Sequence, residues 1–571
     1  MMRRFLVQSI YIGAVLIIFS VRSYAQSGIA PGMIEKNLEQ SRPVFGTPPK
    51  EKAPEIIIKD SRKLKDPGAG PAFLVKKIII EGNTLISDEI LAPLVDVEGG
   101  MEVTLGILAL MATEITALYA TKGYFLTRAF VPQQEIFDGV VKIKVMEGRI
   151  GKITVKGNKK YDAKDFLNMM KSVQEEKVLR EQTLENKLLE LNSMLGIKAR
   201  SILRRGELPG TSDLVLDVTE SSRYLFSYDM DNFGSLFTGQ NRFGLNGTVG
   251  NILTLGDQFS TRWVTSDMVQ DSYSPSYIFP VNYLGTKVRL AYTFSENELG
   301  RSIKFLRSGG TSHSYTWELS HLLSKTRASQ ITVRGGMDFK IFENEQNGNT
   351  SSKENLQDTY FGLGGNFSDK YGGQNFYDIK LQLGLRLLGT SLPIYSREGG
   401  ADNSLISNLT ITRIQPTELL KSFFTIKLAG QITDKRGRSP NLFAVGGVGT
   451  ARGYTLGEIS GDMGYNFSID YTVPFPKKIK LFKGFPTLDQ ILSFNTFFDT
   501  GRVFVRNYLP TERWAQDISS YGGGLTLNIP KKEDKYPGLS FAVSYGVPVP
   551  GGKKPSDRSW GTIYLSGLIN Y

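Results

Sequence analysis

From about Tyr224 to Tyr571, the chain alternates apolar residues with polar or small ones in short runs separated by Gly, Asn, Ser and Pro. In the run from Leu539 to Gly546, every odd position is large and apolar and every even position is small or hydroxylated. This is the period of a β-strand that has lipid on one face and a wet lumen on the other. The pattern recurs at Phe243–Val249, Val288–Phe294, Ile379–Leu387 and Phe424–Leu428. The recurrence predicts a transmembrane β-barrel of the outer-membrane type.

The number of alternating runs predicts the size of the barrel. Candidate strands begin near residues 224, 241, 257, 275, 286, 312, 329, 355, 374, 404, 421, 461, 490, 517, 538 and 559, which makes sixteen antiparallel strands within residues 222–571. An even number brings both ends of the barrel to the periplasmic side. We expect the longest connections to be extracellular, at Glu296–Thr311, Asn344–Asn355 and Leu388–Asn403, and short ones such as Ser324–Ala328 to be periplasmic turns.

The N-terminal segment reads as a secretory signal peptide over residues 1–25. Two arginines precede an apolar core from Ile10 to Phe19, and small residues stand before a cleavage site after Ala25. The alternative is an uncleaved anchor helix, but the apolar core is shorter than the about 20 residues that a spanning helix needs. Residues 26–72 contain a candidate helix at Pro31–Gln40 and a Pro-rich stretch that ends at Pro71. That stretch is typical of a linker, and a disordered leader is the other interpretation of the segment.

Two small tandem domains are predicted between the linker and the barrel, at residues 73–148 and 149–221. The first reads β-α-α-β-β, with strands at Leu74–Ile80, Tyr124–Val131 and Val140–Val145 and a short helix at Asp88–Val95. Its second helix follows Thr104 and carries one apolar stripe, Leu105, Leu108, Ala112, Ile115 and Tyr119. The second copy begins with a strand at Lys152–Lys156, has helices near Asp162–Met170 and along Leu184, Leu188, Leu191 and Leu195, and ends with strands at Lys198–Arg205 and Leu214–Val218.

The composition of the chain argues against several classes of function. The 571 residues include no cysteine, which excludes disulfides and thiolate metal sites. The formal charge of +12 is spread over strands, turns and loops without a basic helix or arm, so no nucleic-acid partner is predicted. The two histidines, His313 and His321, fall on one face of one strand, where we expect lumenal or lipid-interface residues. No nucleotide-binding or hydrolase motif accompanies them, and the sequence predicts no enzyme, cofactor or metal site.

A long Gly-rich connection, Asp434 to Gly461, is too apolar for an extracellular loop. We expect it to fold back into the lumen, where Arg452 then needs an anionic partner. In the thirteenth strand, parity turns Leu492, Phe494 and Phe498 toward lipid and therefore turns Asp499 inward. An Arg452–Asp499 ion pair would hold the loop tip against the barrel wall. The alternative is that Arg452 is a solvated loop residue and Asp499 an ordinary lumenal charge.

Two motifs in this region resemble those of the outer-membrane transporters of two-partner secretion, the TpsB family. The loop tip Ala451-Arg452-Gly453-Tyr454 is similar to the family's [VI]RGY tip, although Ala451 is smaller than the usual residue. Phe497-Phe498-Asp499-Thr500-Gly501 matches the family's F-x-D-x-G strand motif. The resemblance extends over the predicted helix, the linker, two POTRA domains and a sixteen-strand barrel. It implies a lumenal loop lock formed by Arg452, Gly453, Tyr454, Phe497, Asp499 and Gly501.

The resemblance also implies a function. A barrel in the bacterial outer membrane, with its POTRA domains in the periplasm, would export a large unfolded cargo protein that carries an N-terminal secretion domain, without nucleotide hydrolysis. The POTRA domains would bind the cargo partly by adding its extended segments to a sheet edge. Residues 34–40 would form a helix that plugs the resting pore. Outer-membrane lipid and the barrel-assembly machinery are the other implied partners. An insertase related to that machinery and a passive porin or adhesin are the alternatives.

Overall fold

The computed structural model describes residues 54–58, 71–97, 100–267, 270–300, 304–305, 307–385, 396–482, 484–532 and 536–571. These form two compact units, one of residues 54–223 with Lys325–Arg327 and one of the other residues from Tyr224 to Tyr571. The predicted signal peptide, the helix at Pro31–Gln40 and most of the linker lie outside the described residues. Among the helices in the described ranges, none has both the length and the apolar character to cross a membrane.

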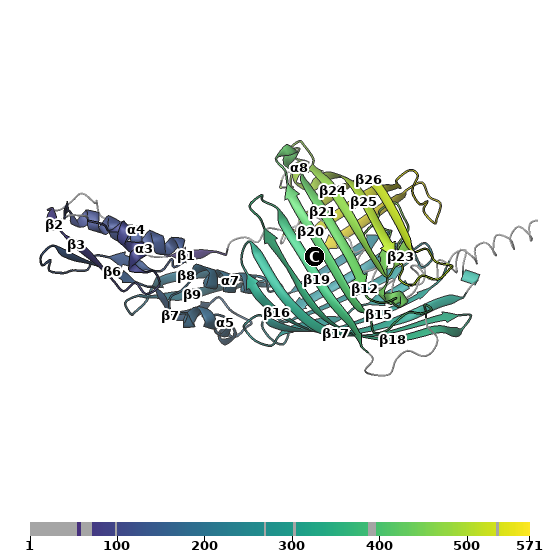
Figure 1. Ribbon diagram of the computed structural model, residues 1–571, viewed down its shortest axis with the longest axis horizontal. Helices are drawn as coiled ribbons and strands as arrows, with labels where there is room; N and C mark the ends of the chain where they lie inside the picture. Colours follow the sequence, from purple (N-terminus) through teal and green to yellow (C-terminus); the bar gives the residue numbers. More distant parts are fainter. Residues whose placement is uncertain are drawn as a thin grey trace, which may run out of the picture. The chain divides into compact units, whose positions relative to one another are not determined.

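The larger unit is a closed antiparallel β-barrel (Figure 1). Its strands are β10 (Tyr224–Asp231), β11 (Arg242–Gly250), β12 (Gln258–Ser266), β13 (Gln270–Tyr273), β14 (Ser276–Pro280), β15 (Thr286–Glu298), β16 (Ser308–Lys325), β17 (Ser329–Gln346), β18 (Asn349–Ser368), β19 (Gln374–Leu385), β20 (Leu405–Pro416), β21 (Phe423–Thr433), β24 (Met463–Pro474), β25 (Leu492–Phe504), β26 (Ala515–Ile529), β27 (Gly538–Pro548) and β28 (Thr562–Asn570). Since β13 and β14 pair with the same neighbours, β12 and β15, they are halves of one strand. In the described chain the barrel therefore has sixteen strands, as predicted.

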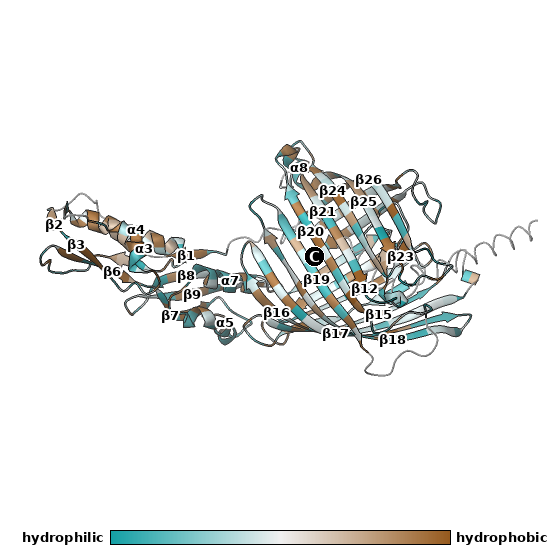
Figure 2. Ribbon diagram, in the orientation of Figure 1, coloured by the Kyte–Doolittle hydropathy of each residue, from teal (hydrophilic) through white to brown (hydrophobic). Residues whose placement is uncertain are grey.

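The alternation of side chains along the strands also follows the prediction. On β27, Phe541 is 44% exposed on the outer face while its neighbour Ser540, on the inner face, is 4% exposed. Figure 2 shows hydrophobic and hydrophilic positions alternating along the barrel strands. β10 closes the barrel against β28, with Ser227 opposite Asn570. A sheet that closes on itself leaves no unpaired edge in the membrane.

One predicted connection is wrong. Residues Asn344–Asn355 do not form a long extracellular loop, because β17 continues to Gln346 and β18 begins at Asn349. The turn consists of Asn347 and Gly348 alone, both with positive φ, and Asn-Gly is the pair that favours such a tight hairpin. The predicted connection Glu296–Thr311 is shortened by β15 and β16 at both ends. Much of the connection predicted at Leu388–Asn403 lies outside the described residues.

The first small region of the other unit contains two sheets. Its elements are β2 (Phe73–Val75), β3 (Lys77–Glu81), α3 (Asp88–Leu91), the 3-10 helix η1 (Ala92–Leu94), β4 (Met101–Val103), α4 (Leu105–Thr121), β5 (Arg128–Phe130) and β6 (Val140–Met146). The strand predicted at Leu74–Ile80 is split at Lys76, whose N–H donates to the carbonyl of Gly139. The strand predicted at Tyr124–Val131 is shorter, with only Arg128–Phe130 paired.

The long helix α4 packs its apolar stripe on the sheet β3-β6-β5. Leu108, Ala112, Ile115 and Tyr119 are buried as predicted, and the hydroxyl of Thr104 caps the helix by accepting from the N–H of Ile107. Leu105 was wrongly included in the stripe, since it is 59% exposed. It is the first helical residue, and side chains on a helix point back toward the N-terminus, which carries Leu105 beyond the packed face.

The second small region repeats this topology with β7 (Arg149–Lys156), α5 (Ala163–Met169), α6 (Lys171–Glu175), α7 (Glu181–Asn192), β8 (Ile197–Arg205) and β9 (Thr211–Glu220). In both regions the last strand pairs in parallel with an earlier one and antiparallel with its predecessor. Leu195 lies beyond the end of α7. Residues Ile56–Ile58 of the predicted linker form strand β1, which adds in parallel to the edge of β8. Three successive β-branched residues suit such a strand.

Candidate functional site

The connection between β21 and β24, residues 434–462, is called loop 6 here, and it is folded and buried. It forms a small hairpin from β22 (Phe443–Val445) and β23 (Ile459–Gly461). Five of its apolar side chains form a buried cluster with residues of β25 and β26: Phe443, Val445, Ala451, Tyr454, Ile459, Val503 and Ile518. The tip also lines a lumenal cavity of about 790 Å³ together with inward residues of the surrounding strands. The apolar loop therefore packs inside the barrel, as its composition indicates.

Arg452, at the loop tip, is bound by two carboxylates on the barrel wall. Its Nε and Nη2 donate to the two oxygens of Asp499 at 2.7 Å each, and its backbone N–H donates to Asp499 at 3.0 Å. Its Nη1 and Nη2 donate to the oxygens of Asp470 at 2.7 and 3.1 Å. The side chain of Arg452 is 12% exposed and that of Asp499 is 1% exposed. Two bidentate contacts fix both the position and the plane of the guanidinium.

The other predicted site residues surround this pair. The guanidinium carbon of Arg452 lies 3.5 Å from the centre of the Phe497 ring, which adds a cation–π contact in a buried setting. Tyr454 is buried, and its hydroxyl donates to the carbonyl of Lys553 at 2.9 Å. Gly453 has a φ of +93°, and a Cβ there would lie 2.8 Å from the carbonyl carbon of Gly546. The backbone of the loop tip is therefore in direct contact with the backbone of the barrel wall. A Cβ at Gly501 would meet Val445 at 2.7 Å.

Three residues of this site were not among those predicted from the sequence. Asp470 and Ser468 lie on β24, and Ser468 donates to Asp499 at 2.6 Å. Tyr564, on β28, accepts a hydrogen bond from the N–H of Gly453 and donates to the carbonyl of Tyr454. Parity alone identifies all three as inward-facing, because the residues beside them on each strand are large and apolar. What parity does not give is the register that brings Ser468 opposite Asp499.

The two histidines lie away from this site, on the outer face of β16. The ring of His313 contacts Phe294, with 5.1 Å between centroids, and its Nδ1 lies 2.9 Å from the hydroxyl of Tyr292. His321 is 2.9 Å from the hydroxyl of Thr286. Of the two predicted settings, the lipid interface is therefore the observed one. Within the part of the chain that the structure describes, no three His, Cys, Asp or Glu side chains are grouped as metal ligands.

Comparison with known proteins assigns the family. The family model of the haemolysin secretion/activation proteins ShlB/FhaC/HecB matches residues 210–527, more than half of the chain, and the ShlB-type POTRA model matches residues 73–148. The chain is 25% identical over 481 residues to the heme/hemopexin transporter protein HuxB of Haemophilus influenzae, covering 81% of this chain and 79% of that protein. It is 24% identical to the outer membrane transporter CdiB of Escherichia coli, covering 72% and 71%.

Solved structures show the same fold. CdiB from Escherichia coli matches with a TM-score of 0.69 at 18% identity, covering 90% of this chain and 93% of that one. BamA from Haemophilus ducreyi, without its first three POTRA domains, matches with a TM-score of 0.53 at 13% identity, covering 87% and 99%. The similarity that the loop and strand motifs indicate therefore extends to the whole fold. The chain belongs to the haemolysin secretion/activation family of ShlB, FhaC and HecB, the outer-membrane transporters of two-partner secretion, which carry POTRA domains in the periplasm.

Proposed function

We propose that this chain exports one large, unfolded cargo protein with an N-terminal secretion domain, and that the tip of loop 6 obstructs the lumen until export begins. The observation that carries the proposal is the attachment of Arg452 to Asp499 and Asp470 on the wall of β24 and β25. A buried arginine with two carboxylates is held firmly while the contacts last, and it loses all of them together when the tip moves. Arg452, Gly453, Tyr454, Phe497, Asp499 and Gly501 then act as one lock.

The proposed cargo site is the free edge of the first POTRA sheet. In the sheet order β3-β6-β5, strand β3 is at the edge, so one side of its backbone is available for a further strand. A groove of about 540 Å³ beside it is lined by Ile78, Ile80, Ala92 and Val95 among others. An extended cargo segment that paired with β3 would place alternate side chains in this groove. The sheet of the second region has the order β1-β8-β9-β7, so β1 already occupies its β8 side.

We further propose the domain limits 1–25 for a signal peptide, 26–72 for plug helix and linker, 73–148 and 149–221 for the two POTRA domains, and 222–571 for the barrel. The POTRA match at residues 73–148 supports the first of these internal limits. The helix at residues 34–40 would leave the pore on its linker as cargo enters. Folding of the cargo outside the cell would supply the driving free energy. The barrel contacts outer-membrane lipid and is inserted by the barrel-assembly machinery.

The experiment that tests the function compares culture supernatant and outer membrane between a deletion strain and the complemented strain. Export predicts the loss of one large secreted protein from the supernatant and no general loss of barrel proteins. A broad loss of outer-membrane barrels would contradict export and indicate an insertase. No change in either fraction would indicate a porin or adhesin.

The lock is tested in the complemented strain by substituting Arg452. Arg452→Ala is expected to lower export while the barrel still assembles, because the buried carboxylates of the site lose their cation. Arg452→Lys keeps the charge but loses the planar fork and is expected to restore export only in part. Arg334→Ala, which removes a lumenal arginine paired with Asp378, is the matched control. Export equal to that of the parent in Arg452→Ala would remove the lock from the mechanism.

A further inference from the structure

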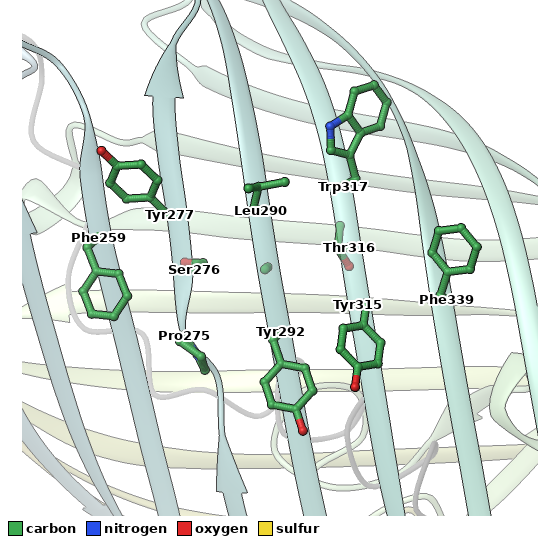
Figure 3. A pocket seen from close by; sticks show the side chains of 11 residues that line it. Phe259, Pro275, Ser276, Tyr277, Leu290, Tyr292, Tyr315, Thr316, Trp317 and Phe339 are labelled. Carbon is green, nitrogen blue, oxygen red and sulfur yellow. The ribbon is translucent and has the colours of Figure 1, made fainter. Parts of the chain in front are cut away.

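An open groove with mostly aromatic walls crosses the outer face of the barrel over β12 to β17 (Figure 3). We call it the aromatic groove, and its volume is about 520 Å³. One wall is formed by Phe259, Tyr277, Leu290 and Trp317, and the other by Tyr292 and Tyr315. Figure 3 shows Phe339 beyond Trp317 and Tyr315, at one end of the groove. Pro275 lies in the floor.

The groove exists because one row of outward positions is only half filled by large side chains. The row on the extracellular side of it is filled by Trp263, Tyr273, Phe294 and His313, whose neighbouring rings lie 6.3, 6.3 and 5.1 Å apart. The row on its periplasmic side holds Phe259, Tyr277, Leu290 and Trp317, which are paired across the strands. Between these rows, parity places Thr261, Pro275, Tyr292 and Tyr315 on the outer face. Thr261 and Pro275 are small, so a hollow remains over β12 and β14, and it is bounded by Tyr292 and Tyr315, whose ring centres lie 5.0 Å apart.

Pro275 also explains why the strand is divided into β13 and β14. Proline has no N–H to donate to the ladder, although its carbonyl still accepts from the N–H of Tyr292 at 3.0 Å. The register is unchanged across the break, since Tyr273 faces Phe294 and Ser276 faces Ala291. The groove is therefore a gap in side-chain volume on a continuous wall, and its shape does not depend on a mobile segment.

The position of the groove along the strands identifies the membrane leaflet that it meets. Phe259 is the second residue of β12, and Tyr277 is close to the end of β14, so this end of the groove lies near the periplasmic turns. Trp317 lies eight residues before Lys325, the last residue of β16. At about 3.3 Å per residue and a tilt of about 45°, eight residues rise roughly 19 Å, beyond the middle of an apolar band about 25 Å tall.

The periplasmic turns beside the groove extend the apolar surface. Leu253 and Leu284, in the turns before β12 and after β14, are 78% and 69% exposed. At the same end, the hydroxyl of Tyr277 donates to Asp257 at 2.6 Å, and Asp257 also accepts from backbone N–H groups of its turn. The polar groups at this end are thus bonded within the protein, and the groove itself offers apolar contact. Its surface is continuous with the interface between barrel and lipid.

We propose that the aromatic groove holds one fatty acyl chain of a phospholipid of the periplasmic leaflet. The occupant follows from the geometry: the groove opens to the hydrocarbon, begins at the level of the periplasmic turns and rises along the wall as an acyl chain does. Rings on both sides contact the chain along its length, which holds it more firmly than the flat outer wall holds its lipids. This site goes beyond the export function, which needs no lipid with a fixed position.

Tryptophan fluorescence tests the proposal on the full-length protein in detergent micelles. The chain has four tryptophans, and Trp263→Phe, Trp514→Phe and Trp560→Phe leave only Trp317 in the groove. The reference variant carries Trp317→Phe as well and Tyr465→Trp, at an outward position of β24 that is distant in the ladder. Phosphatidylethanolamine with dibrominated acyl chains, which quench indole fluorescence on contact, is added stepwise.

Saturable quenching of Trp317 is expected, at about tenfold less lipid per micelle than the reference variant needs, a ratio equal to about 1.4 kcal/mol. Pro275→Phe fills the row and is expected to abolish the saturable phase. Leu428→Phe, on the outer face of β21, is the matched control and should retain it. Equal curves for the groove and the reference, or a saturable phase that survives in Pro275→Phe, would overturn the proposal. Saturable quenching of Trp317 that lipopolysaccharide reverses and unlabelled phosphatidylethanolamine does not would overturn the assignment to the periplasmic leaflet.

Discussion

Asp499→Asn removes the central acceptor of the lock without changing its size. The carboxylate of Asp499 accepts four hydrogen bonds, from the backbone N–H, Nε and Nη2 of Arg452 and from the hydroxyl of Ser468. An amide at this position has one acceptor oxygen, and its NH₂ group points at donors. Arg452 then keeps one full partner, Asp470. The tip is therefore weakened and retains part of its attachment.

The magnitude follows from the burial of the pair. Removing one partner of a buried ion pair costs about 3–5 kcal/mol, because the remaining charge is left without compensation. Asp470 still compensates part of the charge on Arg452, so we expect a loss of about 2–3 kcal/mol relative to the parent. At about 1.4 kcal/mol for each factor of ten, the ratio of released to attached tips rises roughly 30- to 150-fold.

Spin labels measure this ratio directly. Because the chain has no cysteine, Val448→Cys and Thr526→Cys provide a unique pair for labelling. Both residues line the lumenal cavity, one on the loop tip and one on the wall of β26. Pulsed electron paramagnetic resonance of the labelled parent is expected to give one narrow distribution of distances between the two labels. Asp499→Asn should add a second, longer population, and Asp470→Asn a smaller one, since Asp470 does not bind the backbone of the tip.

The control is another lumenal carboxylate that pairs with an arginine. Asp378 binds Arg334 at 2.6 Å, but its side chain is 44% exposed and neither residue contacts loop 6 through a hydrogen bond or ion pair in the described structure. Asp378→Asn makes the same chemical change and should leave the distance distribution unaltered. A single unaltered distance in Asp499→Asn, or an equal second population in Asp378→Asn, would refute the reasoning.

Three further results are expected. Gly453→Ala should release the tip without any change of charge, because its Cβ meets the backbone of Gly546; Gly348→Ala, which has a similar φ but open space, is the control, and the same spin-label pair measures both. Burial raises the pKa of Glu512, but the hydrogen bonds from Arg436 and from the N–H of Leu509, together with the charges of Arg436 and Arg397, outweigh burial and leave the pKa below its ordinary value. The stability that Glu512 contributes to the folded loop is therefore fully present above the ordinary glutamate pKa and is lost as the pH falls through the lowered pKa. Limited proteolysis at residues 505–514 should therefore accelerate only in acid. Glu147→Ala removes the acceptor of the buried Tyr119 hydroxyl and of the Thr84 and Leu85 N–H groups, and should cost about 2 kcal/mol, seen as faster hydrogen exchange in the first POTRA region of the full chain.

The barrel and the inward position of Asp499 were predictable because both depend on parity. In a strand with lipid on one side and water on the other, every second residue faces the lipid, so Asp499 is inward because Phe494 and Phe498 are outward. The same rule makes Asp470 inward, between Ile469 and Tyr471. Its meeting with Arg452 was not predictable, because it depends on the register between β24 and β25. The sequence of the connection between these strands, residues 475–491, gives no signal for that register.

Parity also explains the error at Asn344–Asn355. The hairpin of β17 and β18 continues through polar residues, and pairs such as Glu343 with Lys353 join its strands by salt bridges and backbone hydrogen bonds. Where a strand has no lipid on its outer face, no selection for apolar residues remains and the alternation ends. A polar strand that leaves the membrane therefore looks like a loop in the sequence. Pairing with a neighbour, which the sequence does not display, is what makes it a strand.

Ion pairs hold loop 6 at its tip and at its base, and a further pair, Glu458–Lys553, joins its returning arm to the connection between β27 and β28. The separation of tip and base bears on how the lumen opens. The tip is held by Arg452, whereas the base is held by Arg397–Asp462, Arg436–Glu512 and Arg438–Asp402, each with its closest contact at 2.6–2.7 Å. Asp462 also accepts from the N–H groups of Gly437 and Arg506, so the base is joined to neighbouring loops by backbone as well as side chains. Loss of the tip contacts leaves all of these in place. Movement of the tip alone breaks the contacts of Arg452, whereas withdrawal of the whole loop breaks those at the base as well, and opening by the tip therefore has the lower cost in free energy.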